Sequence, residues 1–351
     1  MSVGQPLDLA LSLEMGQAFR WRRVRDEHVH VRKWGSTSPP WRGNAGGWYS
    51  GVLGEYLVHL RQTDEGLEYR VGDEYGERHD VDLDKQMCDY FRLDDDIGDI
   101  YSQLGRHRAV AQAVERYPGL RLLRQEPWEC MVAYLCSGTN SIRGIRECVE
   151  RIAQLSRRRV RLDDDERHVL PGPVQIAEQG EKALTDLGLG LSSRPRNIFL
   201  MATRLSRGPL LLELEEAGDM PGDEAVKLLD SYSGIGPKIA SCVALMSLDK
   251  LDAFPVDRWV RRALKHCDLS AMSPKLKERV RNSRTMTEEQ QYSVAEWARG
   301  NFGQYAGYAN QYLFHWVEPH KEMVARNGVC RICGTGPPDS TTRTASNSRA
   351  E

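Results

Sequence analysis

The stretch Gly234-Ile235-Gly236-Pro237-Lys238, followed downstream by Pro255-Val256-Asp257, decides the fold of this chain. Two glycines separated by one residue permit a tight hairpin and the close approach of another group, because no Cβ intervenes. Apolar runs on both sides, Ala225–Leu229 and Ile239–Leu245, predict two helices joined by this hairpin. An ordinary turn between helices would look similar. The functional interpretation is a helix-hairpin-helix, whose exposed amides hold a nucleic-acid backbone without reading its sequence.

Lys238 and Asp257 are candidate catalytic residues next to the hairpin. A neutral lysine amine is a good nucleophile and forms a Schiff base with an electrophilic carbon. On DNA this carbon is C1′ of a deoxyribose: attack expels the base, and the imine acidifies the C2′ proton so that the 3′ phosphate leaves by β-elimination. Asp257 stands at the predicted N-cap of a helix over Arg258–Leu264, where a carboxylate can stabilise an oxocarbenium-like sugar and assist proton transfers. Alone, Lys238 is equally typical of a phosphate contact and Asp257 of a plain helix cap; together they favour catalysis.

Composition sets wide bounds. A chain of 351 residues with 40% hydrophobic and 28% charged residues can bury a sizeable core and indicates two domains or more. No apolar run is long enough to span a bilayer, and the first residues lack the pattern of a secretory signal, so we expect no membrane association and a cytoplasmic location by default. The formal net charge of −2 does not indicate a nucleic-acid binder, so that prediction rests on local charge.

Local charge is uneven along the chain. The segment 81–100 is acidic, whereas basic residues gather in three later groups. The groups are Arg143, Arg146, Arg151, Arg157, Arg158, Arg159 and Arg161; then Arg194, Arg196, Arg204 and Arg207; then Arg258, Arg261, Arg262 and Lys265. Solvated helix faces account for such groups in general, and we favour that interpretation for residues 157–161. The third group directly follows the hairpin and Asp257, where a polyanion held by the amides would meet it.

The eight cysteines are scattered through a chain too large to need a disulfide framework, so we expect free thiols. The pair Cys330 and Cys333 resembles half of a zinc site, which His315, His320 or Cys267 could complete. Two unliganded thiols are the favoured interpretation, and we predict neither a metal nor another cofactor. The four closely grouped cysteines that an iron–sulfur cluster needs are absent from the sequence.

The order of the predicted elements indicates an α+β fold. Short alternating runs separated by turns predict an antiparallel sheet within residues 1–100, and helical periodicity dominates residues 101–326, which hold the helix-hairpin-helix. The strands are expected at Phe19–Arg22, His28–Val31, Trp48–Leu53, Tyr56–Leu60 and Leu67–Val71, and clear helices at Trp128–Leu135, Ile142–Leu155 and Tyr292–Arg299. Residues 327–351 carry the cysteine pair and are predicted to be a flexible tail.

These motifs are similar to those of one known family. It resembles the helix-hairpin-helix/Gly-Pro-Asp superfamily of base-excision glycosylases, and within it the 8-oxoguanine DNA glycosylase/AP lyase family. The similarity runs from Leu7 to Val317. Beyond the hairpin it is carried by Met15–Trp21, Gly119–Pro127, Tyr134–Ser137 with Asn140 and Ile142, Leu187–Gly190 and Gly303–Asn310.

The resemblance implies roles at the base pocket. Lys238 would be the Schiff-base nucleophile and Asp257 its catalytic partner. The backbone carbonyl of Gly16 would accept a hydrogen bond from N7 of 8-oxoguanine, the atom that is a donor only in the oxidised base. Cys242 and Phe314 would sandwich the flipped base, although core packing would otherwise be the first interpretation of Cys242. Asn310 stands where the family's base-reading glutamine falls.

The resemblance also implies contacts to the DNA by Gly234, Gly236, Asn140, Arg194 and Arg196. Departures from the family pattern concern the base opposite the lesion. Thr139 and Gly144 replace an asparagine and an arginine, Leu191-Ser192-Ser193 is interpreted as an insertion before Arg194, and Trp259 falls where a histidine is common.

The sequence therefore predicts a monomeric, bifunctional glycosylase and lyase acting on oxidised purine in double-stranded DNA. Its location would be cytoplasmic and nucleoid-associated in a prokaryote, or nuclear in a eukaryote. One alternative is a monofunctional glycosylase for alkylated bases, which usually lacks the lysine. The other is a non-catalytic protein that senses damage, which would need neither Lys238 nor Asp257.

Overall fold

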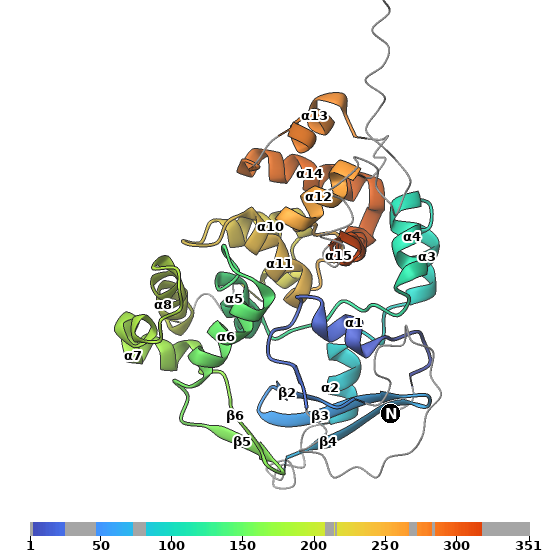
Figure 1. The fold of residues 1–351 in the computed structure, drawn as a ribbon. Helices are drawn as coiled ribbons and strands as arrows, with labels where there is room; N and C mark the ends of the chain where they lie inside the picture. Colours follow the sequence, from blue (N-terminus) through green and yellow to red (C-terminus); the bar gives the residue numbers. More distant parts are fainter. Residues whose placement is uncertain are drawn as a thin grey trace, which may run out of the picture.

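The structure is a computed structural model, and it describes residues 3–24, 47–72, 82–207, 214, 216–266, 272–282 and 285–317. An antiparallel sheet comes first and helices follow (Figure 1), which confirms the predicted α+β class. The strands are β1 Arg22–Arg23, β2 Tyr49–Leu53, β3 Tyr56–Thr63, β4 Gly66–Val71, β5 Arg159–Leu162 and β6 Asp165–His168. The helices are α1 Leu9–Glu14, α2 Leu83–Tyr90, α3 Ile97–Leu104, α4 Arg108–Arg116, α5 Pro127–Leu135, α6 Ile142–Ala153, α7 Pro173–Asp186, α8 Ser193–Ser206, α10 Gly222–Asp230, α11 Pro237–Ser247, α12 Arg258–His266, α13 Pro274–Asn282, α14 Glu288–Phe302 and α15 Ala306–Val317, with a 3₁₀ turn η3 at Gly303–Tyr305.

The four-stranded sheet has the order β1-β2-β3-β4, and every neighbouring pair is antiparallel. The strands predicted at 48–53, 56–60 and 67–71 are confirmed, whereas the predicted strand 19–22 is wrong except for its last residue. Phe19 instead packs edge-on against Tyr134 in α5, and Arg20 donates to Glu150 in α6, so the chain here turns toward the helices. The strand predicted at 28–31 lies outside the described residues.

A second, two-stranded sheet corrects another expectation. The arginines at 157–161 do not lie on a solvated helix face, because residues 159–162 form β5, which pairs with β6. Arg159 and Arg161 both pair with Glu166 on the outer face of this hairpin. The alternate residues Val160 and Leu162 pack against the first sheet, as the period of two in a strand requires.

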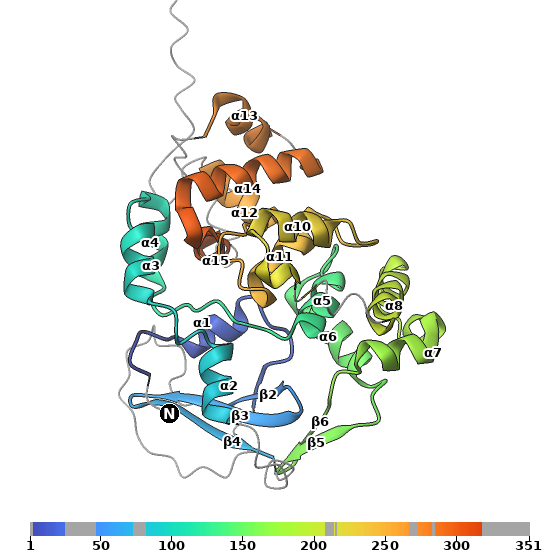
Figure 2. The ribbon, with the colours of Figure 1, turned by 180° about the vertical axis from the view of Figure 1, so that it is seen from behind.

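Most of the helices lie on one side of the two sheets. In both ribbon views α1 lies between the sheet and the helices, while α7 with α8 and α3 with α4 stand at opposite ends of the molecule (Figures 1 and 2). The N-terminal part also contains α1 and α2, and the predicted boundary at residue 100 falls inside α3. The predicted tail 327–351 lies outside the described residues. None of the described helices has the length and apolar character needed to cross a membrane.

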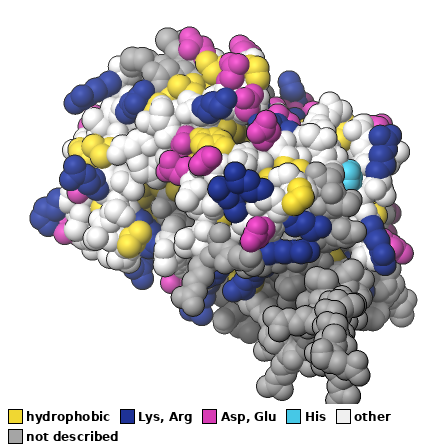
Figure 3. Space-filling view, turned by 90° about the horizontal axis from the view of Figure 1, so that it is seen from above, with side chains coloured by type: hydrophobic (Ala, Val, Ile, Leu, Met, Phe, Trp, Pro, Cys, Tyr) yellow, Lys and Arg dark blue, Asp and Glu magenta, His cyan; other side chains and the backbone are white. Residues whose placement is uncertain are grey.

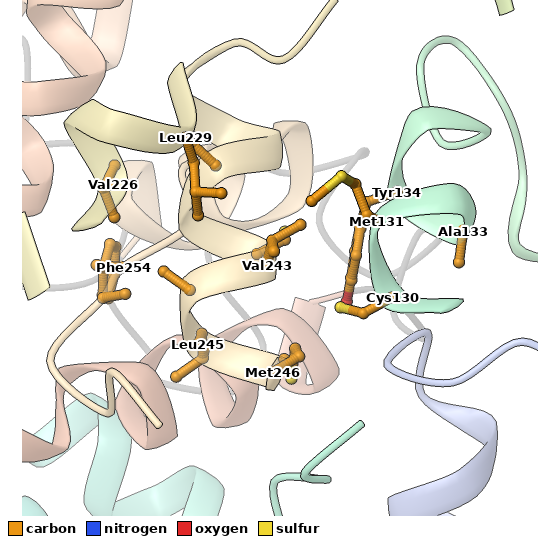
Figure 4. Close-up of a cluster of buried hydrophobic side chains, with 14 of the residues drawn as sticks. Cys130, Met131, Ala133, Tyr134, Val226, Leu229, Val243, Leu245, Met246 and Phe254 are labelled. Carbon is orange, nitrogen blue, oxygen red and sulfur yellow. The ribbon is translucent and has the colours of Figure 1, made fainter. Parts of the chain in front are cut away.

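Helix α11 occupies the centre of the helical core. Its side chains Val243, Leu245 and Met246 are almost completely buried, and Figure 4 shows them between residues of α5 and α10 such as Met131 and Leu229. Burial on several sides fixes the rotation and height of the helix, because interiors are close-packed. A residue in the first turn of α11 is therefore held firmly relative to α5.

The sheet contains one glycine that the packing requires. Gly51 in β2 lies beneath the ring of Trp21, and an added Cβ would overlap the ring atoms. Trp21 is 3% exposed and donates from its indole nitrogen to Tyr90 Oη at 2.9 Å, so the ring cannot shift without losing this bond. We expect Gly51→Ala to lower the free energy of unfolding by about 2 kcal/mol or more, measured by urea denaturation.

The matched control is Gly300→Ala in α14, where an added Cβ meets no atom within 4 Å. This change should raise the free energy of unfolding by about 0.5–1 kcal/mol, because alanine is the better helix former. A Gly51→Ala protein as stable as the wild type would show that the Trp21 ring does not pin this strand.

Candidate active site

Lys238 and Asp257 line the same cavity, of about 320 Å³. The walls come from the turn after α1, from α5 and the start of α6, from α11, from the start of α12, and from α15. The lining residues are Gly16, Phe19, Tyr134, Ser137, Asn140, Ser141, Ile142, Arg143, Ile145, Lys238, Cys242, Met246, Pro255, Asp257, Arg258, Trp259, Asn310, Gln311 and Phe314. The amine and the carboxylate thus share one space large enough for part of a nucleotide.

Lys238 is the second residue of α11, directly after Pro237, which suits the first position of a helix. Its Nζ donates to Ser137 Oγ at 3.1 Å and lies 4.9 Å from the centre of the Tyr134 ring. Cys242 follows one turn later on the same face of the helix and also lines the cavity. Burial raises the pKa of the Cys242 thiol to about 11, so this side chain stays neutral beside Lys238.

Asp257 is the N-cap of α12, as predicted. Its Oδ1 accepts from the backbone N–H groups of Trp259 at 2.8 Å and Val260 at 2.7 Å. Burial raises the pKa of the Asp257 carboxyl above its usual value, while these hydrogen bonds and the charge of Lys238 oppose the shift. The carboxylate is therefore held at a fixed position in the cavity wall, at an electrostatic cost.

The residues predicted to receive a base are brought together here. Gly16 has a φ of +77° and lies so close to Phe314 that an added Cβ would be 3.7 Å from the ring. Cys242 and Phe314 reach the cavity from different helices, α11 and α15. The side chain of Asn310 is buried and donates to the Pro255 carbonyl at 2.8 Å.

The hairpin between α10 and α11 has the conformation that its glycines predict. Gly234 has a φ of +86°, and an added Cβ would overlap the side chain of Asn197 in α8. Ile235 points inward and is 5% exposed. Gly236 is the N-cap of α11 and has open space where a Cβ would stand. A phosphate could therefore approach the first amides of α11 from this side.

The remaining predicted DNA contacts differ in exposure. Arg196 is exposed in the first turn of α8. Asn140 lines the cavity and donates to the Cys136 carbonyl at 3.1 Å. Arg194 is only 5% exposed, and its guanidinium donates to the carbonyls of Leu189 and Gly138. These bonds tie the loop before α8 to the loop before α6.

Arginines of α12 lie at the edge of the cavity. Arg258 lines it, and the guanidinium groups of Arg258 and Arg262 stand 5.1 and 4.5 Å from the centre of the Trp259 ring. Elsewhere the positive charge is dispersed. On the face shown in Figure 3, Lys and Arg side chains stand in separate groups among acidic ones. The local group on α12 thus gives the site a positive character that the net charge conceals.

Two contributors to the site were not predicted from the sequence. Ser137 holds the amine, and Gln311 lines the cavity while donating to the Met15 carbonyl at 3.2 Å. Ser137 stands in the quoted Tyr134–Ser137 motif, but nothing in that motif pairs it with Lys238. Their partners are distant in sequence, so periodicity and spacing carry no signal for either bond.

Within the described residues, no three or more His, Cys, Asp or Glu side chains are grouped as metal ligands would be. His315, one suggested ligand, packs edge-on against the Tyr117 ring at 4.0 Å between centroids. Cys267, His320, Cys330 and Cys333 lie outside the described residues. The described cysteines, among them Cys242, are free thiols.

The sequence is similar to those of known N-glycosylase/DNA lyases. Residues 2–131 match the model of the 8-oxoguanine DNA glycosylase N-terminal domain. The chain is 28% identical over 319 residues to the N-glycosylase/DNA lyase OGG1 of Arabidopsis thaliana, covering 88% of this chain and 76% of the relative. It is 29% identical over 286 residues to the N-glycosylase/DNA lyase of Saccharomyces cerevisiae, covering 78% and 71%.

A solved structure shares the fold. It is the 8-oxoguanine glycosylase/lyase of Clostridium acetobutylicum in complex with double-stranded DNA containing cytosine opposite 8-oxoG. The TM-score is 0.71 at 24% identity, and the alignment covers 90% of this chain and 93% of that one. The structural match shows the fold, and the sequence matches, together with the cavity that Lys238 and Asp257 share, show that the chain is similar to the 8-oxoguanine DNA glycosylases of the helix-hairpin-helix/Gly-Pro-Asp superfamily.

Proposed function

We propose that this protein is a bifunctional DNA glycosylase and AP lyase that excises 8-oxoguanine from duplex DNA in base excision repair. The observation that carries the proposal is the shared cavity: the amine of Lys238 and the carboxylate of Asp257 line it together with Gly16 and Phe314. The related proteins of Arabidopsis and yeast are named N-glycosylase/DNA lyase.

In the proposed reaction the neutral amine of Lys238 attacks C1′ of the damaged nucleotide, and the N9–C1′ bond breaks with its electron pair passing to the base. The attacking nitrogen gives up a proton and the leaving base takes one up. The C1′–O4′ bond then breaks, its electron pair passes to O4′, which is protonated, and C1′ becomes an imine with Lys238. Loss of a C2′ proton then expels the 3′ phosphate, which cuts the strand. The fixed carboxylate of Asp257 stabilises the positive charge that develops on the sugar.

Recognition requires the nucleotide to leave the base stack, because neither C1′ nor the base edge is accessible inside the duplex. The flipped base would lie between Cys242 and Phe314, with the Gly16 carbonyl accepting from its N7–H. Guanine lacks this proton and would present a lone pair to the same oxygen. Asn310 would help at the other edge of the base, although its amide already donates to Pro255.

Double-stranded DNA is the proposed partner. Its backbone would be held by the amides of Gly234 and Gly236 and by Arg196, while Asn140 would face the opposite strand. For Arg194 the buried guanidinium supports a role in positioning the two loops that it joins. We propose that the protein acts as a monomer, in the nucleoid or nucleus where its substrate is.

Two other functions are compatible with parts of the sequence. A monofunctional glycosylase for alkylated bases activates water and would not need an amine in the cavity. A non-catalytic damage sensor would not need a buried carboxylate, whose placement costs free energy. The position of Lys238 beside Asp257 favours the bifunctional enzyme over both.

The test is trapping of the covalent intermediate. The protein is incubated with a duplex that carries one 8-oxoguanine opposite cytosine, and sodium borohydride reduces any imine to a stable amine. We expect a protein–DNA adduct with the damaged duplex and none with the undamaged duplex of the same sequence. Base release and strand cleavage without an adduct would contradict the Schiff-base mechanism, and no base release would contradict the function itself.

Phe314 gives a second test of the pocket. We expect Phe314→Ala to weaken binding to a lesion-containing duplex by about 1–3 kcal/mol, because it removes a face on which the flipped base stacks. Binding to undamaged duplex should change much less, since there the base stays in the helix. Titrations of both duplexes measure the difference. Equal losses on the two would show that Phe314 is not a base-pocket residue.

A further inference from the structure

The turn that contains Gly16 has an unusual hydrogen-bond pattern. Gly16 follows α1 with a φ of +77° and lines the cavity. Among the described residues, no hydrogen bond ends on its carbonyl oxygen, although the turn is packed against Ile142 and Phe314. The oxygen therefore keeps its capacity to accept a bond from a ligand in the cavity.

The carbonyls on both sides of Gly16 are held by glutamine side chains. The Met15 carbonyl accepts from Gln311 Nε2 at 3.2 Å. The Gln17 carbonyl accepts from Gln125 Nε2 at 3.1 Å. All three glutamines are 6% exposed or less, so water does not compete freely for these bonds. The peptide unit that carries the Gly16 carbonyl thus lies between two peptide units, 15–16 and 17–18, whose carbonyls are each held by a buried hydrogen bond.

The side chain of Gln17 anchors the turn from its other side. Its Nε2 donates to the carbonyls of Ser12 at 3.2 Å and Arg121 at 2.9 Å, and its Oε1 accepts from the N–H of Leu123 at 3.1 Å. The turn is thereby tied to the preceding helix and to the segment before α5. The contacts of Gln17 and Gln125 thus fix the turn to segments from the N-terminal half of the chain.

Gln311 is the member that comes from the opposite side. It lies on α15, the helix that also supplies Asn310 and Phe314 to the cavity. Asn310 is engaged with the Pro255 carbonyl, whereas Gln311 reaches across to the turn. One side-chain bond thus couples the helix that carries the stacking face to the turn that carries the base-reading oxygen.

We propose that Gln311 is a positioning residue for the Gly16 carbonyl and, with Gln17 and Gln125, sets the discrimination between 8-oxoguanine and bases without a proton on N7. This inference rests on the proposed function. A fixed oxygen attracts a donor and repels a lone pair at the same place. An oxygen that can change its direction binds the N7–H donor less strongly and repels an N7 lone pair less strongly. The difference in affinity between the two bases then becomes smaller.

The experiment compares Gln311→Met, which keeps the length of the side chain but cannot donate, with the matched control Gln291→Met. Gln291 in α14 makes the same kind of bond, to the Met286 carbonyl, outside this cavity. Competition binding uses duplexes that carry 8-oxoguanine or 8-methoxyguanine, which has a substituent at C8 but no proton on N7. Strand cleavage at a preformed abasic site is measured in parallel, because no base is read there.

We expect Gln311→Met to narrow the binding ratio of the two duplexes by about fivefold, the effect of one lost hydrogen bond, with abasic-site cleavage changed less than twofold. Gln311→Glu should narrow the ratio at least as much, since its carboxylate would face the Met15 carbonyl. Gln291→Met should leave both readouts unchanged.

An unchanged ratio in both Gln311 variants would overturn the inference, as would parallel losses in binding of both duplexes and in abasic-site cleavage, which would indicate a structural role alone. Wild-type protein that releases no 8-oxoguanine would instead contradict the proposed function. The two failures are thus separated by the wild-type measurement.

Discussion

Replacing Lys238 with glutamine is expected to lower strand cleavage at 8-oxoguanine by about a thousandfold or more and to abolish the borohydride-trapped adduct. An amide nitrogen has no available lone pair for attack on C1′, and loss of a covalent nucleophile removes the whole reaction path rather than one contribution to it. Single-turnover cleavage and trapping on the same duplex measure both effects.

The same change should leave the fold and lesion binding nearly intact. Lys238 is only partly buried, and a glutamine amide can still donate to Ser137 Oγ, the acceptor of the lysine. The variant therefore separates capture of the damaged nucleotide from chemistry upon it. A lesion-binding affinity close to that of the wild type would confirm that the loss of cleavage is chemical.

Lys182→Gln serves as the control for removing a lysine. Lys182 is exposed on α7 and pairs with Asp186 one turn away, far in the sequence from every residue that lines the cavity. Its cleavage rate should equal that of the wild type. Persistence of the adduct in Lys238→Gln would mean that another amine is the nucleophile, and the proposed assignment would then be wrong.

The parts of the site that the sequence predicts are those encoded locally. The hairpin follows from Gly234 and Gly236, and the cap at Asp257 follows from its place before an apolar-periodic run, because helix ends depend on a few neighbouring residues. The sheet follows from the partly alternating runs at 48–53 and 56–60, and its register in the structure is fixed by antiparallel pairing. These signals need no knowledge of distant contacts.

What the sequence could not predict depends on long-range packing. The β5–β6 hairpin lies in a part of the sequence that is otherwise helical. It is stabilised by the packing of Val160 and Leu162 against the first sheet, which the local sequence does not reveal. Arg194 resembles a DNA contact in the sequence, yet its guanidinium is buried against two carbonyls. The bond from Gln311 to Met15 spans 296 residues. A glutamine has no local pattern that reveals such a partner.

The ionised carboxylate of Asp257 is expected to lower the stability of the folded protein, although the proposed reaction requires it. Burial raises the pKa of this carboxyl in the folded protein, so the folded state binds the carboxyl proton more tightly than the unfolded state does. Below the carboxyl's unfolded pKa the group is neutral in both states and costs nothing. As pH rises through the raised folded pKa, ionisation lowers the free energy of unfolding.

Asp257→Asn is therefore expected to slow base release by about a hundredfold or more at neutral pH while the free energy of unfolding stays equal or rises. Asparagine caps a helix about as well as aspartate, so the bonds to Trp259 and Val260 survive, but the charge that stabilises the developing cation is lost. Single-turnover base release and urea denaturation, each at several pH values, measure the two effects.

The matched control is Asp96→Asn at the N-cap of α3, whose carboxylate accepts from the N–H of Asp99 outside the cavity. It should change neither the rate nor, beyond a few tenths of a kcal/mol, the stability. In the wild type, base release should fall as acid protonates Asp257, and this part of the pH dependence should be missing in Asp257→Asn. A variant as fast as the wild type would remove Asp257 from the mechanism and leave it as a helix cap.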